Sequence, residues 1–167
     1  MTKKKKDYRF DRRTQKQFEK DIKEGHKIER MLLDRWLDCV EKTKGKRPMV
    51  EFTGCGEDGE YLERNQVNDN ADFYVDGYGL VEIKFSKPLL TENFHLKISQ
   101  VESYIRQDAN ILMVIGTETD TPKYVLITTD NLVFIKGSCK IVRFYGFGGK
   151  ESYRIGVSQF AWREFSD

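Results

Sequence analysis

Apolar positions recur with a helical period through the first quarter of the chain. Five of them fall on one helix face at spacings of 4, 11, 3 and 4: Phe18, Ile22, Leu33, Trp36 and Val40. This spacing fits a period of 3.6 residues and predicts an amphipathic helix over 14–43. Gly45 and Pro48 follow directly and are expected to end it.

A second helical pattern lies in the middle of the chain, where Phe94, Ile98, Val101 and Ile105 predict a helix over about 94–107. Short apolar runs bounded by turn residues predict strands elsewhere. The expected strands cover 49–52, 71–75, 80–85, 110–116, 123–128, 132–136, 139–146 and 152–158. Helices interspersed with strands predict an α/β (α+β) fold, in which helices flank a mixed central sheet.

The chain of 167 residues has the length of one domain, which we expect to cover 14–167. Charge is concentrated before that domain, because the first 20 residues contain nine basic and three acidic residues. We expect residues 1–13 to form a flexible basic arm. Such an arm is compatible with a polyanionic partner, and equally with a solvated tail that aids solubility.

Several classes of protein are excluded by composition. The longest apolar runs are too short to span a bilayer, and no secretory signal is present, so no membrane partner is expected. Cys39, Cys55 and Cys139 are scattered, with no C-x-x-C pair, which favours a reducing cytoplasmic location over a disulfide framework or a zinc site. His26 and His95 are the only histidines and have no nearby cysteine, so an HNH or zinc-finger site is not expected.

The candidate chemistry lies on the expected strand over 80–85. Residues two apart share a strand face, so Glu82 and Lys84 project together, while Val81 and Ile83 point to the other side. A charged pair of this kind is common on a solvated strand face. It becomes informative only if further acidic residues join it.

Asp72 joins this pair or turns away from it, depending on the hairpin that precedes the strand. A loop centred on Tyr78 places Asp72 opposite Lys84, on the face of the two charged residues. A tight turn at 76–77 would pair Asp72 with Val81 and direct it to the other face. The second glycine of the turn favours the longer loop.

Two carboxylates beside an ammonium group offer the hard oxygen ligands that Mg²⁺ prefers. Glu29 adds a third carboxylate, because its spacing from Ile22, Leu33 and Trp36 places it inside the apolar stripe of the first helix. A carboxylate on a core-facing stripe is costly unless it is paired or bound to metal. The alternative is that Glu29 lies at the edge of the stripe and pairs with a lysine or arginine.

Asp72, followed after nine residues by Glu82-Ile83-Lys84, resembles the motif of the PD-(D/E)XK nuclease superfamily. Glu29 stands where many members carry a glutamate on their first helix. The expected order of elements is also similar to the αβββαβ core of that superfamily, with extra C-terminal strands.

The resemblance covers about 20–128. Ala71 replaces the nominal proline of the motif, which many members also lack.

The resemblance implies a metal-dependent DNA endonuclease that hydrolyses phosphodiester bonds with Mg²⁺, for which Mn²⁺ substitutes. The implied metal ligands are Asp72, Glu82, the main-chain carbonyl of Ile83 and, directly or through water, Glu29. Lys84 would orient the attacking water or stabilise the transition state. The small size favours structure-directed cleavage of junction or branched DNA.

Gln100 and Tyr104 are four residues apart on the second expected helix, with Lys97 one turn earlier. They are similar to the Q-x-x-x-Y element of RecB-type nucleases, which implies a role in substrate binding. The alternative is an ordinary polar helix flank. If the element is functional, a single-strand-directed exonuclease is a further hypothesis.

Two other hypotheses stay open. A catalytically inactive module with the nuclease fold would bind nucleic acid or a protein partner, although retention of all four charged residues argues against it. Some superfamily members of this size, including Holliday-junction resolvases, act as dimers. The resemblance therefore suggests a homodimer, which nothing in the sequence fixes.

Overall fold

A computed structural model describes residues 13–54 and 70–165. The predicted basic arm therefore lies outside the described residues except for Arg13, as does Cys55. The described helices are α1 (Gln15–Lys44), α2 (Ile98–Gln107) and α3 (Thr129–Ser138), with the short 3-10 helices η2 (Tyr145–Phe147) and η3 (Val157–Gln159). The strands are β1 (Val50–Phe52), β2 (Phe73–Val75), β3 (Gly79–Ser86), β4 (Asn93–Lys97), β5 (Ala109–Ile115), β6 (Lys123–Ile127), β7 (Lys140–Phe144), β8 (Lys150–Gly156) and β9 (Arg163–Glu164).

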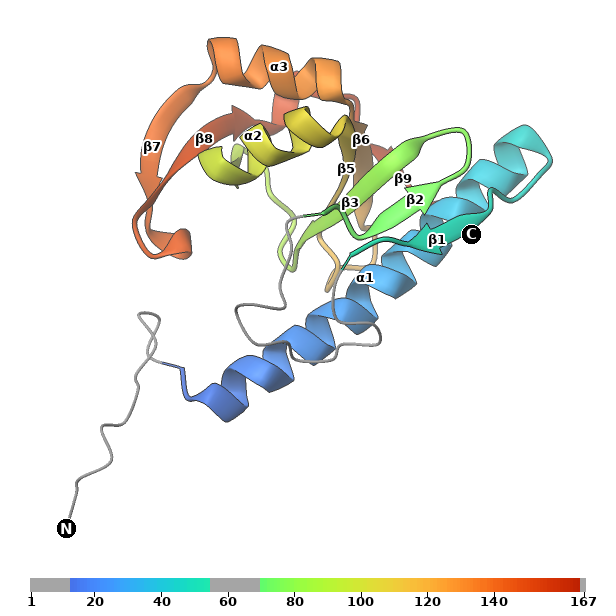
Figure 1. The fold of residues 1–167 in the computed structure, drawn as a ribbon, viewed down its shortest axis with the longest axis horizontal. Helices are drawn as coiled ribbons and strands as arrows, with labels where there is room; N and C mark the ends of the chain where they lie inside the picture. The colour runs from blue at the N-terminus through green and yellow to red at the C-terminus, as the bar shows by residue number, and fades with distance from the viewer. Residues whose placement is uncertain (1–12, 55–69, 166–167) are drawn as a thin grey trace.

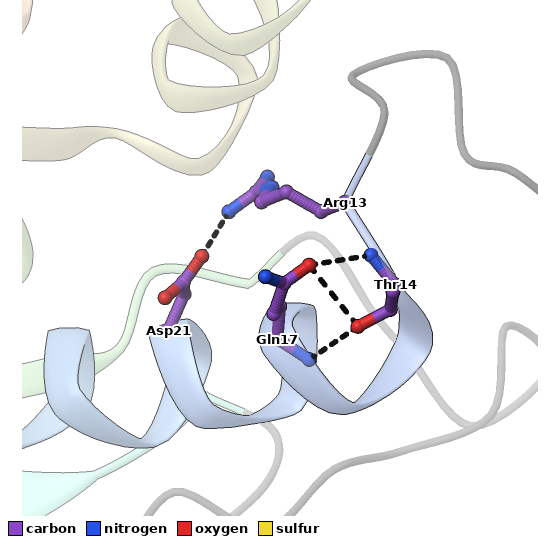
Figure 2. Close-up of polar contacts among 4 residues, drawn as sticks. All are labelled: Arg13, Thr14, Gln17 and Asp21. Atoms are coloured by element: carbon purple, nitrogen blue, oxygen red, sulfur yellow. Dashed lines mark hydrogen bonds and ion pairs between the residues drawn. The ribbon is translucent and has the colours of Figure 1, made fainter.

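Helix α1 begins with a capping box. The Thr14 hydroxyl accepts a hydrogen bond from the Gln17 amide, and the Gln17 side chain accepts one from the Thr14 amide (Figure 2). Arg13 extends the same turn by pairing with Asp21 at 2.7 Å. These contacts satisfy amide groups that would otherwise lack a partner at the start of the helix.

The other end of α1 confirms the predicted stop. Gly45 adopts a left-handed conformation with φ 76°, and its amide donates to the Glu41 carbonyl. The buried residues of α1 lie in its second half, between Leu32 and Val40. The first half extends past the strands (Figure 1), so the apolar stripe is in the core only over part of its length.

The main sheet has six strands in the order β1-β2-β3-β5-β6-β9. Neighbours β3 and β5 are parallel and all other pairs are antiparallel. The connection from β3 to β5 contains β4 and α2, as a parallel pair requires a crossover. The fold class is the predicted mixture of helices around a mixed sheet.

Two apolar cores cover opposite faces of this sheet. Helix α1 packs on the face that carries Val81 and Ile83 of β3. Helices α2 and α3 pack on the opposite face, against Ile111 and Met113 of β5. Figure 1 shows α1 on one side of the strands and α2 and α3 together on the other. Residues that alternate along β3 therefore meet different helices.

A second, three-stranded sheet has the order β4-β8-β7 and lies beside α2 and α3 (Figure 1). The two strands expected over 139–146 and 152–158 are thus present, but they leave the main sheet. Only β9 returns to it, beside β6. Among the described helices, none combines the length and apolar character that crossing a membrane requires.

The predicted helix over 94–107 is wrong in its first turn. Residues Asn93–Lys97 form β4, which pairs with β8 from Asn93↔Gly156 to Lys97↔Ser152. Phe94 and Leu96 are buried, whereas His95 and Lys97 are only partly buried, which is the two-residue period of a strand. The four-residue spacing from Phe94 to Ile98 imitated a helix across the junction of two elements.

The predicted strand over 132–136 is also wrong, because this segment lies in α3. Thr128 and Asn131 form a capping box at the start of that helix. Leu132 and Ile135 are buried at a helical spacing, while Val133 and Phe134 are exposed. A short apolar run cannot distinguish a helix from a strand by period alone.

Candidate active site

The hairpin of β2 and β3 determines where Asp72 lies. Val75 pairs with Gly79, so the loop is centred on Gly77 and the predicted centre at Tyr78 is wrong. Gly77 and Gly79 both have positive φ, near 75–78°, which lets this short loop close. The ladder ends at Phe73↔Val81.

Continued by one residue, this register brings Asp72 opposite Glu82 and not opposite Lys84. The register differs from the predicted one by two residues, and a change of two keeps every side chain on its face. The predicted common face for Asp72, Glu82 and Lys84 therefore survives the correction. It is the face that α2 covers, because Val81 and Ile83 point to α1.

Glu82 and Lys84 form a tight ion pair on that face. The Lys84 Nζ lies 2.6 Å from the Glu82 Oε1, with side-chain exposures of 28% and 10%. Tyr104 of α2 shares hydrogen bonds with both groups, and the Lys84 ammonium lies 5.9 Å from its ring centre. Burial raises the pKa of the Tyr104 hydroxyl, so this group stays protonated as a donor.

The backbone around Asp72 is held from two sides. Thr53 and Gly54 donate their amides to the Asp72 carbonyl at 2.8 and 3.2 Å. On the other side, the Gln107 side chain accepts from the Ala71 amide at 2.9 Å and donates to the Ser103 hydroxyl at 2.8 Å. Gln107 thus ties the residue before Asp72 to helix α2, which also carries Tyr104.

Gly54 leaves space for the Asp72 carboxylate. A Cβ at position 54 would lie 2.5 Å from the Asp72 Oδ1 and 3.0 Å from its Cα. Both separations are shorter than a normal contact, so any other residue at position 54 would displace the carboxylate. No sequence pattern points to Gly54 or Gln107, because their roles depend on segments that meet only in the folded chain.

Glu29 reaches the same group from α1. Burial, together with the charges of Asp72 and Glu82 and against the lowering effect of Lys84, raises its pKa from 4.5 to about 8. Groups influence one another in this way only when they are close. Glu29 therefore lies within electrostatic reach of the three charged residues of the hairpin.

The pKa values of Asp72 and Lys84 are both raised, for different reasons. Burial and the Glu82 charge raise the pKa of Asp72 from 3.8 to about 6, against the lowering effect of Lys84. Burial lowers the pKa of Lys84, but Glu82 and Tyr104 outweigh it, so the net pKa lies above 10.5. Lys84 is thus held as a cation among acids that repel one another.

Lys97 lies at the edge of this group, at the junction of β4 and α2. Burial and the nearby charges of Lys150 and Lys84 lower its pKa, which places Lys97 near both lysines. Gln100 lies one turn into α2 and is partly buried, on the flank that Tyr104 continues. Of the three predicted substrate-binding residues, Tyr104 and Lys97 thus adjoin the charged group.

The carboxylates of Asp72 and Glu82 suit a Mg²⁺ ion that is also bound by the phosphates of a substrate. Within the described ranges, no three histidine, cysteine or acidic side chains form a ready cluster for a metal. Mg²⁺ is usually bound through one or two carboxylates together with substrate phosphates and waters, and Asp72 and Glu82 offer such a pair. Their repulsion, which contributes to the raised pKa of Asp72, is the interaction that a divalent cation would relieve.

A cavity of about 330 Å³ lies elsewhere, between the second half of α1 and the main sheet. Its lining includes Trp36, Cys39, Tyr78, Tyr124 and Arg163. None of the residues around Asp72 contributes to it. The charged group is therefore distinct from this cavity.

Comparisons with known proteins leave the chain without an assigned family. No family model matches it, and no curated protein or solved structure matches it either. The chemistry of this protein is therefore to be inferred from the arrangement of Glu29, Asp72, Glu82, Lys84 and Tyr104.

Proposed function

We propose that this protein is a Mg²⁺-dependent deoxyribonuclease of the PD-(D/E)XK type that acts in the cytoplasm. The observation that carries the proposal is the shared face of Asp72, Glu82 and Lys84, of which Glu82 is buried and the other two are partly buried, with Glu29 within electrostatic reach of both acids. Such an arrangement costs stability, and strongly perturbed acids with a specific cation partner mark functional sites.

Asp72 and Glu82 would hold the metal, with the main-chain carbonyl of Ile83 as a further ligand and Glu29 acting through water. Bound Mg²⁺ neutralises phosphate charge and lowers the pKa of its water; Mn²⁺ would substitute for it. Tyr104 keeps Lys84 in place through the hydrogen bonds described above.

Lys84 would stabilise the negative charge that develops during phosphodiester cleavage. Its raised pKa keeps it cationic, and a preorganised cation stabilises a transition state without reorganisation of the site. Its partner Glu82 holds the ammonium at a fixed position beside Asp72. Removal of either acid or of Lys84 should therefore abolish cleavage.

The test is cleavage of supercoiled plasmid, single-stranded DNA and a four-way junction with Mg²⁺, Mn²⁺ or EDTA. We expect metal-dependent cutting that falls by at least about 100-fold in Asp72→Asn and Lys84→Ala. Asp120→Ala and Lys46→Ala remove exposed charges away from the site and serve as matched controls. Cutting of circular plasmid would establish an endonuclease, and restriction to free ends would establish an exonuclease.

Equal cutting by Lys84→Ala and the parent protein would contradict the proposal. Binding of DNA without cutting under any metal condition would favour the inactive binding module. The molecular mass of the active species in solution would test the suggested homodimer.

A further inference from the structure

The two faces of the three-stranded sheet carry different kinds of side chain, apolar on one face and basic on the other. Phe94, Leu96, Tyr153 and Ile155 are buried against α2 and α3. The alternate residues of each strand point to the other side of the sheet. This outer face carries four basic residues, which we call the basic face: Lys97 of β4, Lys140 of β7, and Lys150 and Arg154 of β8.

No carboxylate shares the outer face. The register pairs Lys140 with Arg154, Val142 with Ser152 and Phe144 with Lys150. Lys140, Lys150 and Arg154 are all exposed, and in the described part of the chain no ion pair joins any of them to an acid. Their charge is therefore available to an anionic partner.

Aromatic rings lie among these cations. Phe144 stacks on His95 at 3.9 Å with an interplanar angle of 7°, and Phe147 meets Phe144 edge-on. The Lys97 ammonium lies 4.9 Å from the Phe147 ring centre. Tyr145, at the turn between β7 and β8, is 96% exposed, so the face of its ring is accessible for stacking on a base.

The spacing of the cations suits a polyphosphate. Arg154 and Lys150 are four residues apart on β8, about 13 Å along the strand. Their side chains can therefore contact different phosphates of one DNA strand. The basic face is next to the candidate active site, because Lys97 is close to both Lys150 and Lys84.

We propose that the basic face binds the phosphates of a DNA strand and leads it to the candidate active site, with Tyr145 stacked on an unpaired base. This rests on the proposed nuclease function and narrows its substrate to DNA with unpaired bases beside a duplex. Alternating cations and exposed rings are how proteins hold single strands. The fully exposed ring distinguishes this surface from one that contacts only duplex phosphates.

The test is binding of fluorescent DNA by the full chain in EDTA, measured by anisotropy over a range of salt concentrations. The probes are a duplex, a single strand and a fork with splayed ends. Lys140→Ala/Lys150→Ala should reduce the steepness of the log Kd against log salt plot by about 1.4 to 1.8. The matched control Lys42→Ala/Lys46→Ala removes equal charge at the far end of α1 and should leave it unchanged.

Tyr145→Ala should weaken binding of the fork and the single strand by about 5- to 100-fold. It should leave binding of the duplex unchanged. Equal effects of the two double-lysine variants would contradict DNA binding by the basic face. Unchanged fork binding by Tyr145→Ala would contradict the stacking of Tyr145 on a base. Equally tight binding of polyglutamate would indicate an acidic protein partner and would also overturn the proposal.

DNA binding is measured in EDTA, where no metal-dependent cleavage takes place. The DNA-binding face and the nuclease function are therefore tested separately. If no substrate is cut but Lys140→Ala/Lys150→Ala still loses fork binding, the DNA-binding face stands and the nuclease function fails. If cleavage occurs with the binding results unchanged by the variants, the nuclease function stands and the basic face is wrong.

Discussion

In the main sheet, the charged residues of β3 lie under α2, where Glu82 is 10% exposed and Lys84 is held by it and by Tyr104. In the three-stranded sheet, Lys140, Lys150 and Arg154 are exposed and form no ion pair with an acid among the described residues. Buried charges depend on one another, whereas exposed charges act singly. The first arrangement suits chemistry at a fixed position, and the second suits attraction of a large anion.

The largest expected loss of stability comes from breaking the ion pair of Glu82 and Lys84. Glu82→Ala should lower the free energy of unfolding by about 2–3 kcal/mol, because it leaves the Lys84 ammonium without its main partner in a partly buried site. Urea unfolding at neutral pH measures this. Asp38→Ala, which breaks an exposed contact with Arg47, should cost less than about 1 kcal/mol; equal losses would contradict the distinction between the two kinds of pair.

Glu29 should make stability depend on pH. Its folded-state pKa of about 8 lies above the ordinary 4.5, so as pH rises between these values the unfolded chain releases a proton that the folded chain retains. Stability in EDTA should therefore fall over this window. Glu29→Gln should remove most of that fall and stabilise the protein by about 2–4 kcal/mol at pH 8, with little effect near pH 4.5.

Thermal or urea unfolding of both proteins at several pH values checks this prediction. A Glu29→Gln variant whose stability follows the parent curve would show that Glu29 is solvated or already paired. That result would favour the alternative in which it lies at the edge of the α1 stripe.

Gln107→Ala should have a smaller effect. It leaves the Ala71 amide without the acceptor that α2 provides, which should cost about 1–2 kcal/mol. Ser99→Ala, on an exposed position of the same helix, is the control and should change stability by less than about 0.5 kcal/mol. Identical losses in the two variants would show that Gln107 does not position the segment before Asp72.

The smallest effect is expected on the three-stranded sheet. Lys140→Ala/Lys150→Ala should change the free energy of unfolding by no more than about 0.5 kcal/mol, at any pH between 5 and 8. Calorimetry in EDTA measures this. A loss comparable to that of Glu82→Ala would mean that these lysines are structural and not free for a ligand.

The sequence predicts the charged face better than the elements around it. The Glu82-x-Lys84 spacing and the helical period near Glu29 depend on local geometry, which the fold preserves. The junction at Lys97 and the run at 132–136 were misassigned because short apolar segments fit both periods. The hairpin register depends on the positive φ of Gly77 and Gly79. The presence of the two glycines indicates a turn, but it does not determine which residues pair across it.

Long-range contacts could not be predicted at all. Gly54 and Gln107 meet the Asp72 segment from 18 and 36 positions away, and neither has a residue type that implies a site. The three-stranded sheet shows the same limit, since β4 pairs with β8 although 52 residues lie between Lys97, the last residue of β4, and Lys150, the first residue of β8. The period of apolar and polar residues predicts which face of an element a side chain lies on. It does not predict which distant segment packs against that face.

The proposed function depends most on a divalent cation relieving the repulsion between Asp72 and Glu82. The most direct measurement is thermal unfolding at pH 8 as Mg²⁺ or Mn²⁺ is titrated into the metal-free protein, compared with Asp72→Asn. We expect metal to raise the Tm of the parent protein and to have little effect on the variant. An equal response of the two proteins, or no response of the parent at millimolar metal, would contradict it.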